Sequence, residues 1–247
     1  MHQDIQEPAG PDSDRDPDFG LGLDDSETVG ASVERRVLRA WRFRGGAEAA
    51  LPTPSLLILG GVHGDEPSSV GAVAELGQRL RSGAVTAAGP VWLMPRLNPD
   101  GLALGRKNSA RDVDLNRNFP AANFTRAHDP GYFPGAEPLS EPETAALAAL
   151  IDRARVAAIV AVHAPFACVN YDGPAAAWAA QVAAACGWPA RGDIGYPTPG
   201  SLGSWFGIDR GLPILTLELP PGPLDGFRDR CRAALDEALT MNPVRIR

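Results

Sequence analysis

The sequence has few cysteines, few aromatic residues and no long hydrophobic run. Its three cysteines, Cys168, Cys186 and Cys231, include no CxxC pair, which argues against both a disulfide framework and a cysteine-rich zinc site. No segment reaches the roughly 18 uncharged residues that a membrane helix needs, and the amino terminus lacks the basic start and apolar core of a secretory signal. We therefore expect a cytoplasmic protein that has reduced, buried thiols and does not contact a membrane.

Basic charge is also scarce, which argues against a nucleic-acid partner. The formal net charge is -7, and residues 1–30 hold nine acidic side chains and one basic one, so the rest of the chain is nearly neutral. The same thirty residues are rich in proline and glycine, and they cannot bury enough apolar area to offset the cost of ordering. We predict a disordered acidic tail over residues 1–30 and one folded, catalytic domain over residues 31–247.

Short apolar runs alternate with helical patterns along this domain. The runs are bounded by glycine, proline or charge, as strands buried on both faces tend to be. We predict a single α/β domain with a twisted, mixed but mostly parallel sheet and helices on both faces. The expected strands are 34–43, 55–61, 90–95, 157–164 and 213–219, and the expected helices are 67–82, 140–155, 174–186 and 224–240.

Polar side chains follow three of the predicted strands directly. His63 and Glu66 come after the strand at 55–61, while His163 and Glu218 lie at the ends of later strands. Ligands of α/β proteins collect at the carboxyl ends of the strands, so two imidazoles and one or two carboxylates should converge there. A buried carboxylate such as Glu218 needs a partner or a function, because burying it alone is costly.

This set of side chains suits a catalytic zinc ion. Zinc takes nitrogen and oxygen ligands, and its catalytic sites have three protein ligands and one open position. We expect one Zn²⁺ per chain, held by His63, Glu66 and His163, with Glu218 left free as the base. Asp65, which lies between two of the ligands, is not expected to bind the metal.

Two long segments, 96–139 and 188–205, lack periodicity, and loops of this kind are usually functional. Guanidinium groups recognise carboxylates with paired hydrogen bonds or stabilise an oxyanion. A substrate with a free carboxylate is therefore implied. The arginines of the first segment are Arg96, Arg106, Arg111, Arg117 and Arg126.

Read together, six motifs resemble the zinc carboxypeptidase superfamily, and within it most closely the bacterial murein peptide amidases. The resemblance covers roughly residues 55–222, and the motifs occur in the order of the family. They are "HGDE", "NPDG", "DVDLNRNFP", "AVHAPFACVNYDG", "GYPTPGSLGSW" and "LELP".

The resemblance implies a role for each motif. His63, Glu66 and His163 match the zinc ligands, and Glu218 matches the glutamate that activates the attacking water. Asn116 and Arg117 match the pair that holds the terminal carboxylate of the substrate, and Tyr196 matches a mobile tyrosine that closes over it. Arg106 best matches the arginine that stabilises the oxyanion. The run "RKNSARDVDLN" is one residue longer than usual, so Lys107 and Arg111 are alternatives for this role.

The resemblance also implies a substrate, the γ-D-glutamyl–diaminopimelate bond of murein tripeptides during cell-wall recycling. One alternative is an ordinary metallocarboxypeptidase, and another is a deacylase related to the aspartoacylases and desuccinylases. A third is a module that binds cell-wall peptides without cutting them, although the presence of Glu218 disfavours it. The sequence leaves the oligomeric state open, a homodimer included.

Overall fold

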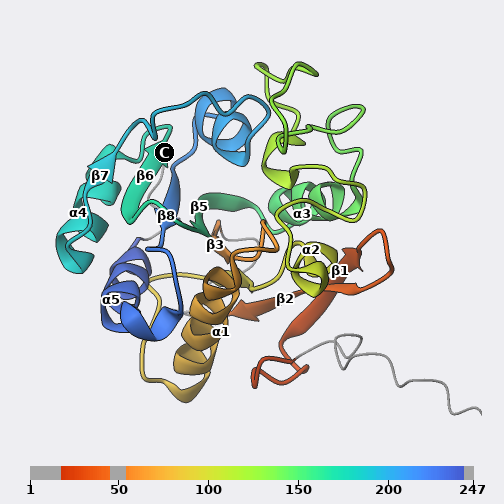
Figure 1. The fold of residues 1–247 in the computed structure, drawn as a ribbon. Helices are drawn as coiled ribbons and strands as arrows, with labels where there is room; N and C mark the ends of the chain where they lie inside the picture. Colours follow the sequence, from red (N-terminus) through yellow and green to blue (C-terminus); the bar gives the residue numbers. More distant parts are fainter. Residues whose placement is uncertain (1–17, 45–53, 242–247) are drawn as a thin grey trace, which may run out of the picture.

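The computed structural model describes residues 18–44 and 54–241, which form one eight-stranded sheet (Figure 1). The strand order is β1-β2-β4-β3-β5-β8-β6-β7. The pairs β3–β4, β3–β5, β5–β8 and β6–β7 are parallel, and the other three are antiparallel. The predicted mixed α/β sheet is thereby confirmed. The strands are β1 (Ser26–Ala31), β2 (Val37–Phe43), β3 (Ser55–Leu59), β4 (Val91–Met94), β5 (Val156–His163), β6 (Cys168–Asp172), β7 (Ala190–Arg191) and β8 (Ile214–Glu218).

Helices cover both faces of the sheet, as predicted. One apolar core lies between the sheet and α1, α4 and α5, and a second lies between the opposite face and α3 together with a π-helix (Figure 1). The helices are α1 (Pro67–Ser82), α2 (Pro99–Leu104), α3 (Pro142–Arg153), α4 (Ala176–Cys186) and α5 (Arg228–Ala238), and the π-helix is Gly203–Asp209.

Strand β3 shows why such a short apolar run can hold the centre of the sheet. Successive side chains of a strand point to opposite faces. Leu56 and Ile58 therefore enter the first core, while Leu57 and Leu59 enter the second. All four are fully buried, and burial of each stabilises the fold by about 1.5–3 kcal/mol.

The predicted boundary between tail and domain at residue 30 is wrong, because β1 begins at Ser26 and pairs with β2. Leu21 is only 4% exposed, and the Trp41 indole nitrogen donates a hydrogen bond to the Gly22 carbonyl oxygen at 2.8 Å. One buried leucine and one backbone carbonyl thus anchor a segment whose average composition is acidic. Residues 1–17 of the predicted tail lie outside the described residues.

Most of the predicted elements are present with shifted ends. Strand β2 starts at Val37, because the chain turns at Arg35, which has a φ of 64°. The helix predicted over 224–240 is divided into a 3₁₀ turn, Leu224–Gly226, and α5. The sequence analysis missed β1, β6, β7 and α2. The three cysteines are free and buried, as predicted.

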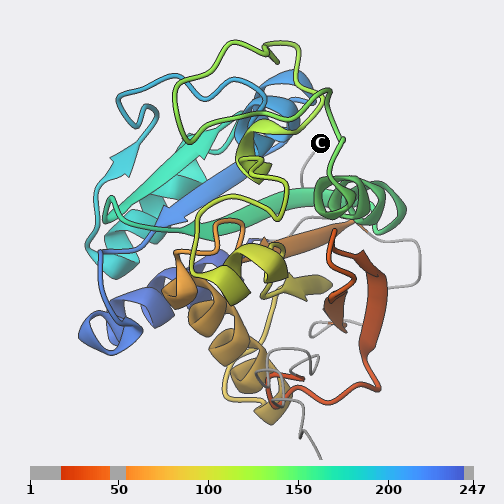
Figure 2. The same ribbon diagram turned by 45° about the vertical axis from the view of Figure 1, so that its right-hand side comes forward.

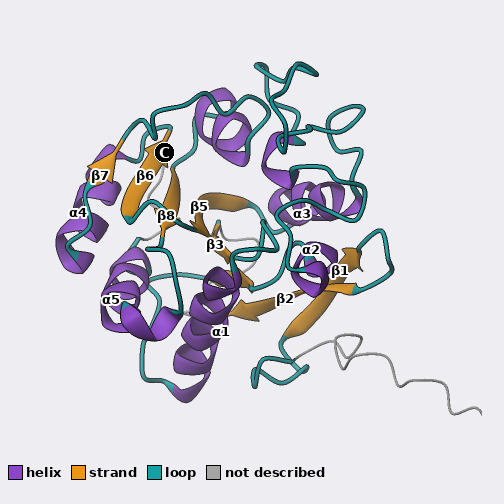
Figure 3. Cartoon of the chain, in the orientation of Figure 1, coloured by secondary structure: helices purple, strands orange, loops and turns teal. Residues whose placement is uncertain are grey.

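The two long segments without periodicity come together in space. Figure 3 shows them mainly as loop, and Figure 2 shows them side by side above the sheet. The Phe119 amide donates to the Gly200 carbonyl oxygen at 2.9 Å, and the Gly200 amide donates to Oδ1 of Asn123 at 3.0 Å. In the part of the chain that the structure describes, no helix is long and apolar enough to cross a membrane.

Candidate active site

Three neighbouring parallel strands bring the predicted site residues together. Strands β3, β5 and β8 are adjacent in the sheet, so their carboxyl ends lie at the same edge. His163 is the last residue of β5 and pairs directly with Glu218, the last residue of β8. His63 lies in the turn that follows β3. Backbone register alone therefore brings side chains from distant parts of the sequence to one place.

The turn after β3 is held in place by a close glycine contact. A Cβ atom added to Gly64 would lie 2.0 Å from the carbonyl carbon of Gly101, so no larger residue fits there. Asn98 caps the amino terminus of α2, and its Oδ1 accepts a hydrogen bond from the Gly101 amide at 2.8 Å. The "HGDE" and "NPDG" motifs thus form one packed unit, which fixes the backbone that carries His63.

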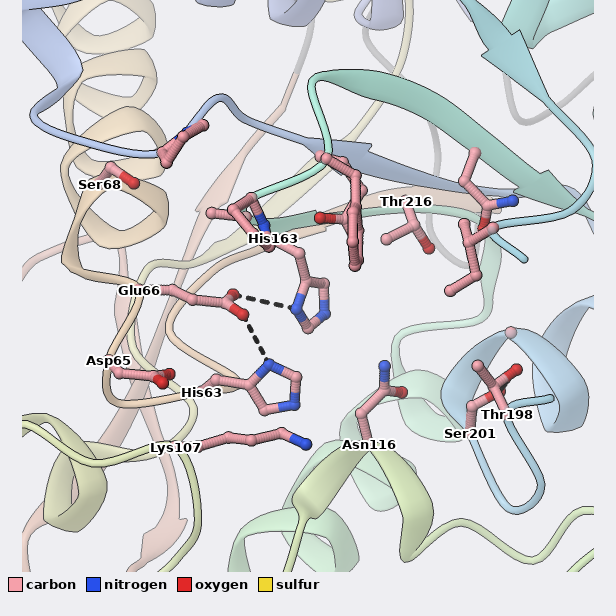
Figure 4. A pocket seen from close by; sticks show the side chains of 18 of the residues that line it. His63, Asp65, Glu66, Ser68, Lys107, Asn116, His163, Thr198, Ser201 and Thr216 are labelled. Atoms are coloured by element: carbon pink, nitrogen blue, oxygen red, sulfur yellow. Dashed lines mark hydrogen bonds and ion pairs between the residues drawn. The ribbon is translucent and has the colours of Figure 1, made fainter. Parts of the chain in front are cut away.

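Glu66 lies between the two imidazoles (Figure 4). Its Oε1 is 2.7 Å from Nδ1 of His63, and its Oε2 is 3.1 Å from Nδ1 of His163. One potential ligand atom from each of the three side chains lies within 4.8 Å of the others. Burial opposes ionisation of Glu66, but the neighbouring imidazoles outweigh it and lower its pKa to about 2.

The donor set fits zinc. Two imidazole nitrogens and one carboxylate are the ligand types of catalytic zinc sites. Burial lowers the pKa of His63, but hydrogen bonds to Asp114 and Glu66 outweigh this effect and raise it to about 9. Without a cation, the negative charges around His63 therefore favour a proton on its ring, and a divalent cation would satisfy the same charges.

Asp114 orients His63, and the sequence analysis did not assign it. Its Oδ1 lies 3.2 Å from Nε2 of His63, and its Oδ2 is 2.8 Å from Nζ of Lys107. It is fully buried, yet His63, Arg117 and Lys107 hold the pKa of this carboxyl below its usual range against the effect of burial. Metal-binding histidines commonly need such a partner at the second ring nitrogen. The aspartate of "DLNR" is Asp114, so this motif could have been used to predict the partner of a metal-binding histidine.

Glu218 lines the cavity and has one buried oxygen without a partner in the part of the chain that the structure describes. The residue is 5% exposed, and its Oε2 has no hydrogen-bond partner among the described residues. Burial raises the pKa of this carboxyl, and the nearby His163 opposes that effect. A buried carboxylate oxygen left without a partner is costly, so a ligand or water is expected there.

A cavity of about 890 Å³ opens over these residues, and all three of the predicted substrate-binding residues line it. Asn116, Arg117 and Tyr196 contribute to its wall. Oδ1 of Asn116 accepts the Leu202 amide at 3.0 Å, so the two long loops together set the orientation of this side chain. Figure 4 shows Asn116 facing His63 and His163 from the opposite wall.

The structure corrects the placement of Arg106. Its side chain is exposed, and its guanidinium donates to the carbonyl oxygens of Ser109 and Ala110 at 2.8 and 2.9 Å. Lys107 lines the cavity instead, and Figure 4 shows it reaching toward His63. Of the five loop arginines, all within the described residues, only Arg117 lines the cavity. Arg111 is a surface residue 3.8 Å from Glu141.

Aromatic side chains form the rim of the cavity. Tyr196 is 39% exposed, and its ring centroid lies 6.4 Å from that of Tyr132 and 6.1 Å from that of Phe166. Nζ of Lys107 lies over the Tyr132 ring at 3.5 Å from its centroid, a cation–π contact that holds the ammonium group in place. The sequence analysis did not single out Tyr132 or Phe166.

The fold, together with a His-Glu-His group that could hold a metal ion, defines a hydrolase of the metallopeptidase class. The chain belongs to the zinc carboxypeptidase family, whose sequence pattern matches residues 25–177. It is 38% identical over 205 residues to murein peptide amidase A of Escherichia coli K12. The matched region covers 76% of this chain and 80% of that protein. The chain is 37% identical over 181 residues to murein peptide amidase A of Vibrio campbellii, covering 67% and 69%.

Solved structures agree with this assignment. The crystal structure of the murein-tripeptide amidase MpaA from Escherichia coli O157 matches with a TM-score of 0.70 and 33% identity, covering 92% of this chain and 96% of that one. Bovine thrombin-activatable fibrinolysis inhibitor matches with a TM-score of 0.72 and 18% identity, covering 87% and 88%. The second likeness shows the shared fold alone.

Proposed function

We propose that this enzyme is a zinc-dependent amidase that cleaves the γ-D-glutamyl–diaminopimelate bond of murein tripeptide. One observation supports the reaction type: the His-Glu-His group, the buried carboxylate of Glu218 and the Asn116–Arg117 pair lie in one cavity. The choice of substrate rests on the similarity of this chain to proteins named murein peptide amidase. A cytoplasmic role in cell-wall recycling is part of the proposal.

His63, Glu66 and His163 would hold the zinc ion. When bound, zinc acts as a Lewis acid that polarises the scissile carbonyl and makes water more acidic. Glu218 takes the proton of the attacking water at Oε2 and passes it to the departing amine. Its pairing with His163 across β5 and β8 holds this carboxylate beside the metal ligands.

Arg117 and Asn116 bind the terminal carboxylate of the substrate and set which bond is cut. A guanidinium and an amide NH₂ together supply directional donors for a carboxylate. Nη1 of Arg117 donates to the carbonyl oxygen of Asn116 at 2.7 Å, which ties the two residues together. Tyr196 lies exposed at the rim, where it can close over a bound peptide.

Lys107 is the residue that stabilises the oxyanion. Among the described residues, Lys107 and Arg117 are the only lysine or arginine side chains that line the cavity, and Arg117 already binds the carboxylate. Asp114 and the Tyr132 ring hold the Lys107 ammonium close to the metal-ligand set. A positive charge fixed in advance where an oxyanion forms lowers the barrier of acyl transfer.

A panel of substrates, each tested with and without a zinc chelator, examines the proposal. We expect chelator-sensitive release of diaminopimelate from L-Ala-γ-D-Glu-meso-diaminopimelate, with little hydrolysis of acetylaspartate or of ordinary L-peptides. Preferred cleavage of L-peptides would instead identify a general carboxypeptidase, and hydrolysis of acetylaspartate would identify a deacylase. Tight binding of the tripeptide without turnover would identify a binding module.

A further inference from the structure

A buried carboxylate outside the cavity, Asp100 of the "NPDG" motif, has no part in the reaction steps described so far. It lies in the first turn of α2 and is fully buried. Three donors from the turn between β1 and β2, residues 32–36, surround it. The Ser32 hydroxyl donates to Oδ1 at 2.7 Å, the Glu34 amide donates to Oδ2 at 3.0 Å, and Nη1 of Arg36 donates to Oδ1 at 2.7 Å. Both carboxylate oxygens are thus satisfied, as a buried charge requires.

The turn at residues 32–36 lies at the edge of the sheet that carries the active site. Strand β2 runs antiparallel to β4, with Trp41 opposite Leu93 and Phe43 opposite Val91. The first residues of β2 therefore lie beyond the carboxyl end of β4, which is parallel to β3. Through Asp100, α2 is bound to the turn that follows β1 (Figure 1). The outer strands of the sheet are thereby connected to the helix behind the site.

Helix α2 supports the backbone on both sides of the proposed chemistry. It has only six residues, too few for a stable isolated helix, so contacts with its neighbours fix its position. Its Gly101 packs against Gly64, the residue after His63. The carbonyl oxygen of Lys107 accepts the Gly64 amide and Nδ2 of Asn98, each at 3.1 Å. A displacement of α2 should therefore move both the turn that carries His63 and the backbone of Lys107.

We propose that Asp100 is a positioning residue, which sets the placement of His63 and Lys107 by fixing α2 to the turn at residues 32–36. This inference rests on the proposed function, in which these two residues are a zinc ligand and the group that stabilises the oxyanion. Asp100 and the turn residues, all within the described chain, do not line the cavity. Their influence on the site therefore passes through the backbone of α2.

Substrate binding provides an independent reference. Oδ1 of Asn116 accepts the Leu202 amide at 3.0 Å, so this carboxylate-binding residue is oriented by the second long loop. A displaced α2 should lower the zinc affinity and kcat, while KM stays within about twofold of the native value. A fall in kcat at constant KM is the result expected when an interaction made only in the transition state is lost.

The experiment compares Asp100→Asn with the native enzyme in three measurements. They are the zinc dissociation constant from competition with a chromophoric chelator, kcat and KM for the murein tripeptide, and the free energy of urea unfolding of the zinc-free protein. We expect zinc affinity to fall by about 10- to 100-fold, as on loss of a group that orients a metal ligand. We expect kcat to fall by about 10-fold or more. Ser32→Ala removes one donor and keeps the charge, so it should show smaller losses of both quantities in a protein that folds.

Asp236→Asn is the matched control, because this carboxylate on α5 also accepts hydrogen bonds from an arginine. Arg79, in the last turn of α1 and thus at the end remote from Glu66, donates to its two oxygens at 2.7 Å each. The control should lower the free energy of unfolding and leave zinc affinity and kcat unchanged. In a Lys107→Met background, Asp100→Asn should lower kcat by a smaller factor than in the native enzyme, because part of its effect is exerted through Lys107.

A lower free energy of unfolding with native zinc affinity and native kcat in Asp100→Asn would overturn the inference, because it would show a purely structural role. An equal loss of zinc affinity in Asp236→Asn would also overturn it. An equal factor in kcat with and without Lys107 would overturn the part that concerns Lys107. Failure of the proposed function would instead appear in the native enzyme as no chelator-sensitive cleavage of the tripeptide. The zinc titration tests Asp100 even then, because it requires no substrate.

Discussion

His163 and Glu218 face each other as a register pair of the parallel strands β5 and β8. The proposed metal ligand and the proposed base are therefore one inter-strand spacing apart, about 4.8 Å between backbones. Both strands are buried in the centre of the sheet, so the arrangement does not depend on a flexible loop. A change in either side chain should leave the backbone position of the other unaltered.

Replacement of Glu218 by glutamine should separate proton transfer from metal binding. The amide keeps the shape of the side chain but cannot take a proton from water, so kcat should fall by about 10²- to 10⁴-fold. Zinc content, measured by mass spectrometry of the intact protein, should stay at one ion per chain. Activity close to that of the native enzyme would remove Glu218 from the role of base.

Replacement of His163 by alanine should remove the metal, because only two protein ligands remain. We expect a strongly reduced zinc content after dialysis and a corresponding loss of activity. His128→Ala is the control, since His128 is an exposed loop residue whose ring contacts Phe133. Stoichiometric zinc in the His163→Ala variant would show that this imidazole is not a ligand.

The variants Lys107→Met and Arg106→Met distinguish the two candidates for the residue that stabilises the oxyanion. Removal of the Lys107 ammonium should lower kcat by about 10²-fold or more, as loss of one oxyanion donor does. Arg106→Met should have little effect on kcat, because the Arg106 guanidinium is bonded to loop carbonyls outside the cavity. Lys107→Arg should recover part of the lost rate. The reverse pattern would return the role to Arg106.

Glu143 should make the stability of the protein depend on pH. It is fully buried, Oε1 accepts the Val33 amide at 3.2 Å, and Oε2 has no hydrogen-bond partner among the described residues. Burial raises its pKa from 4.5 to about 7, and the carboxyls of Asp100 and Glu141 add to the effect. The folded state therefore holds the proton more tightly than the unfolded chain. The contribution of protonated Glu143 to the free energy of unfolding is fully present below pH 4.5 and is lost as the pH rises through 7.

Urea unfolding of the native protein and Glu143→Gln at pH 5 and pH 8 measures this effect. The amide mimics the protonated acid, so the variant should gain up to about 3 kcal/mol relative to the native protein between these pH values. The exposed Glu137→Gln serves as the control and should show no such pH-dependent gain. A difference in the free energy of unfolding that does not change with pH would contradict the prediction.

Much of the central sheet could be predicted because the apolar runs are short and bounded. Helix α1 matches its predicted range of 67–82, and β3, β5 and β8 were predicted within about two residues of their ends. Strand β1 was missed because an acidic average composition concealed the anchoring contacts of Leu21 and Trp41. Strand β6 was missed because proline and small residues surround a run of only five residues, Cys168–Asp172.

The types of donor and their order follow from the amino-acid sequence alone: two imidazoles and two carboxylates, each placed just after or at the end of an apolar run. Hydrophobic burial sets the strands, and parallel strands deliver their carboxyl ends to one edge. The three-dimensional packing was needed to choose between Lys107 and Arg106, because both are basic neighbours in an irregular loop and differ in the direction of their side chains. It alone also brought Asp100 against Ser32 and Arg36, since these contacts depend on how α2 packs against the turn between β1 and β2.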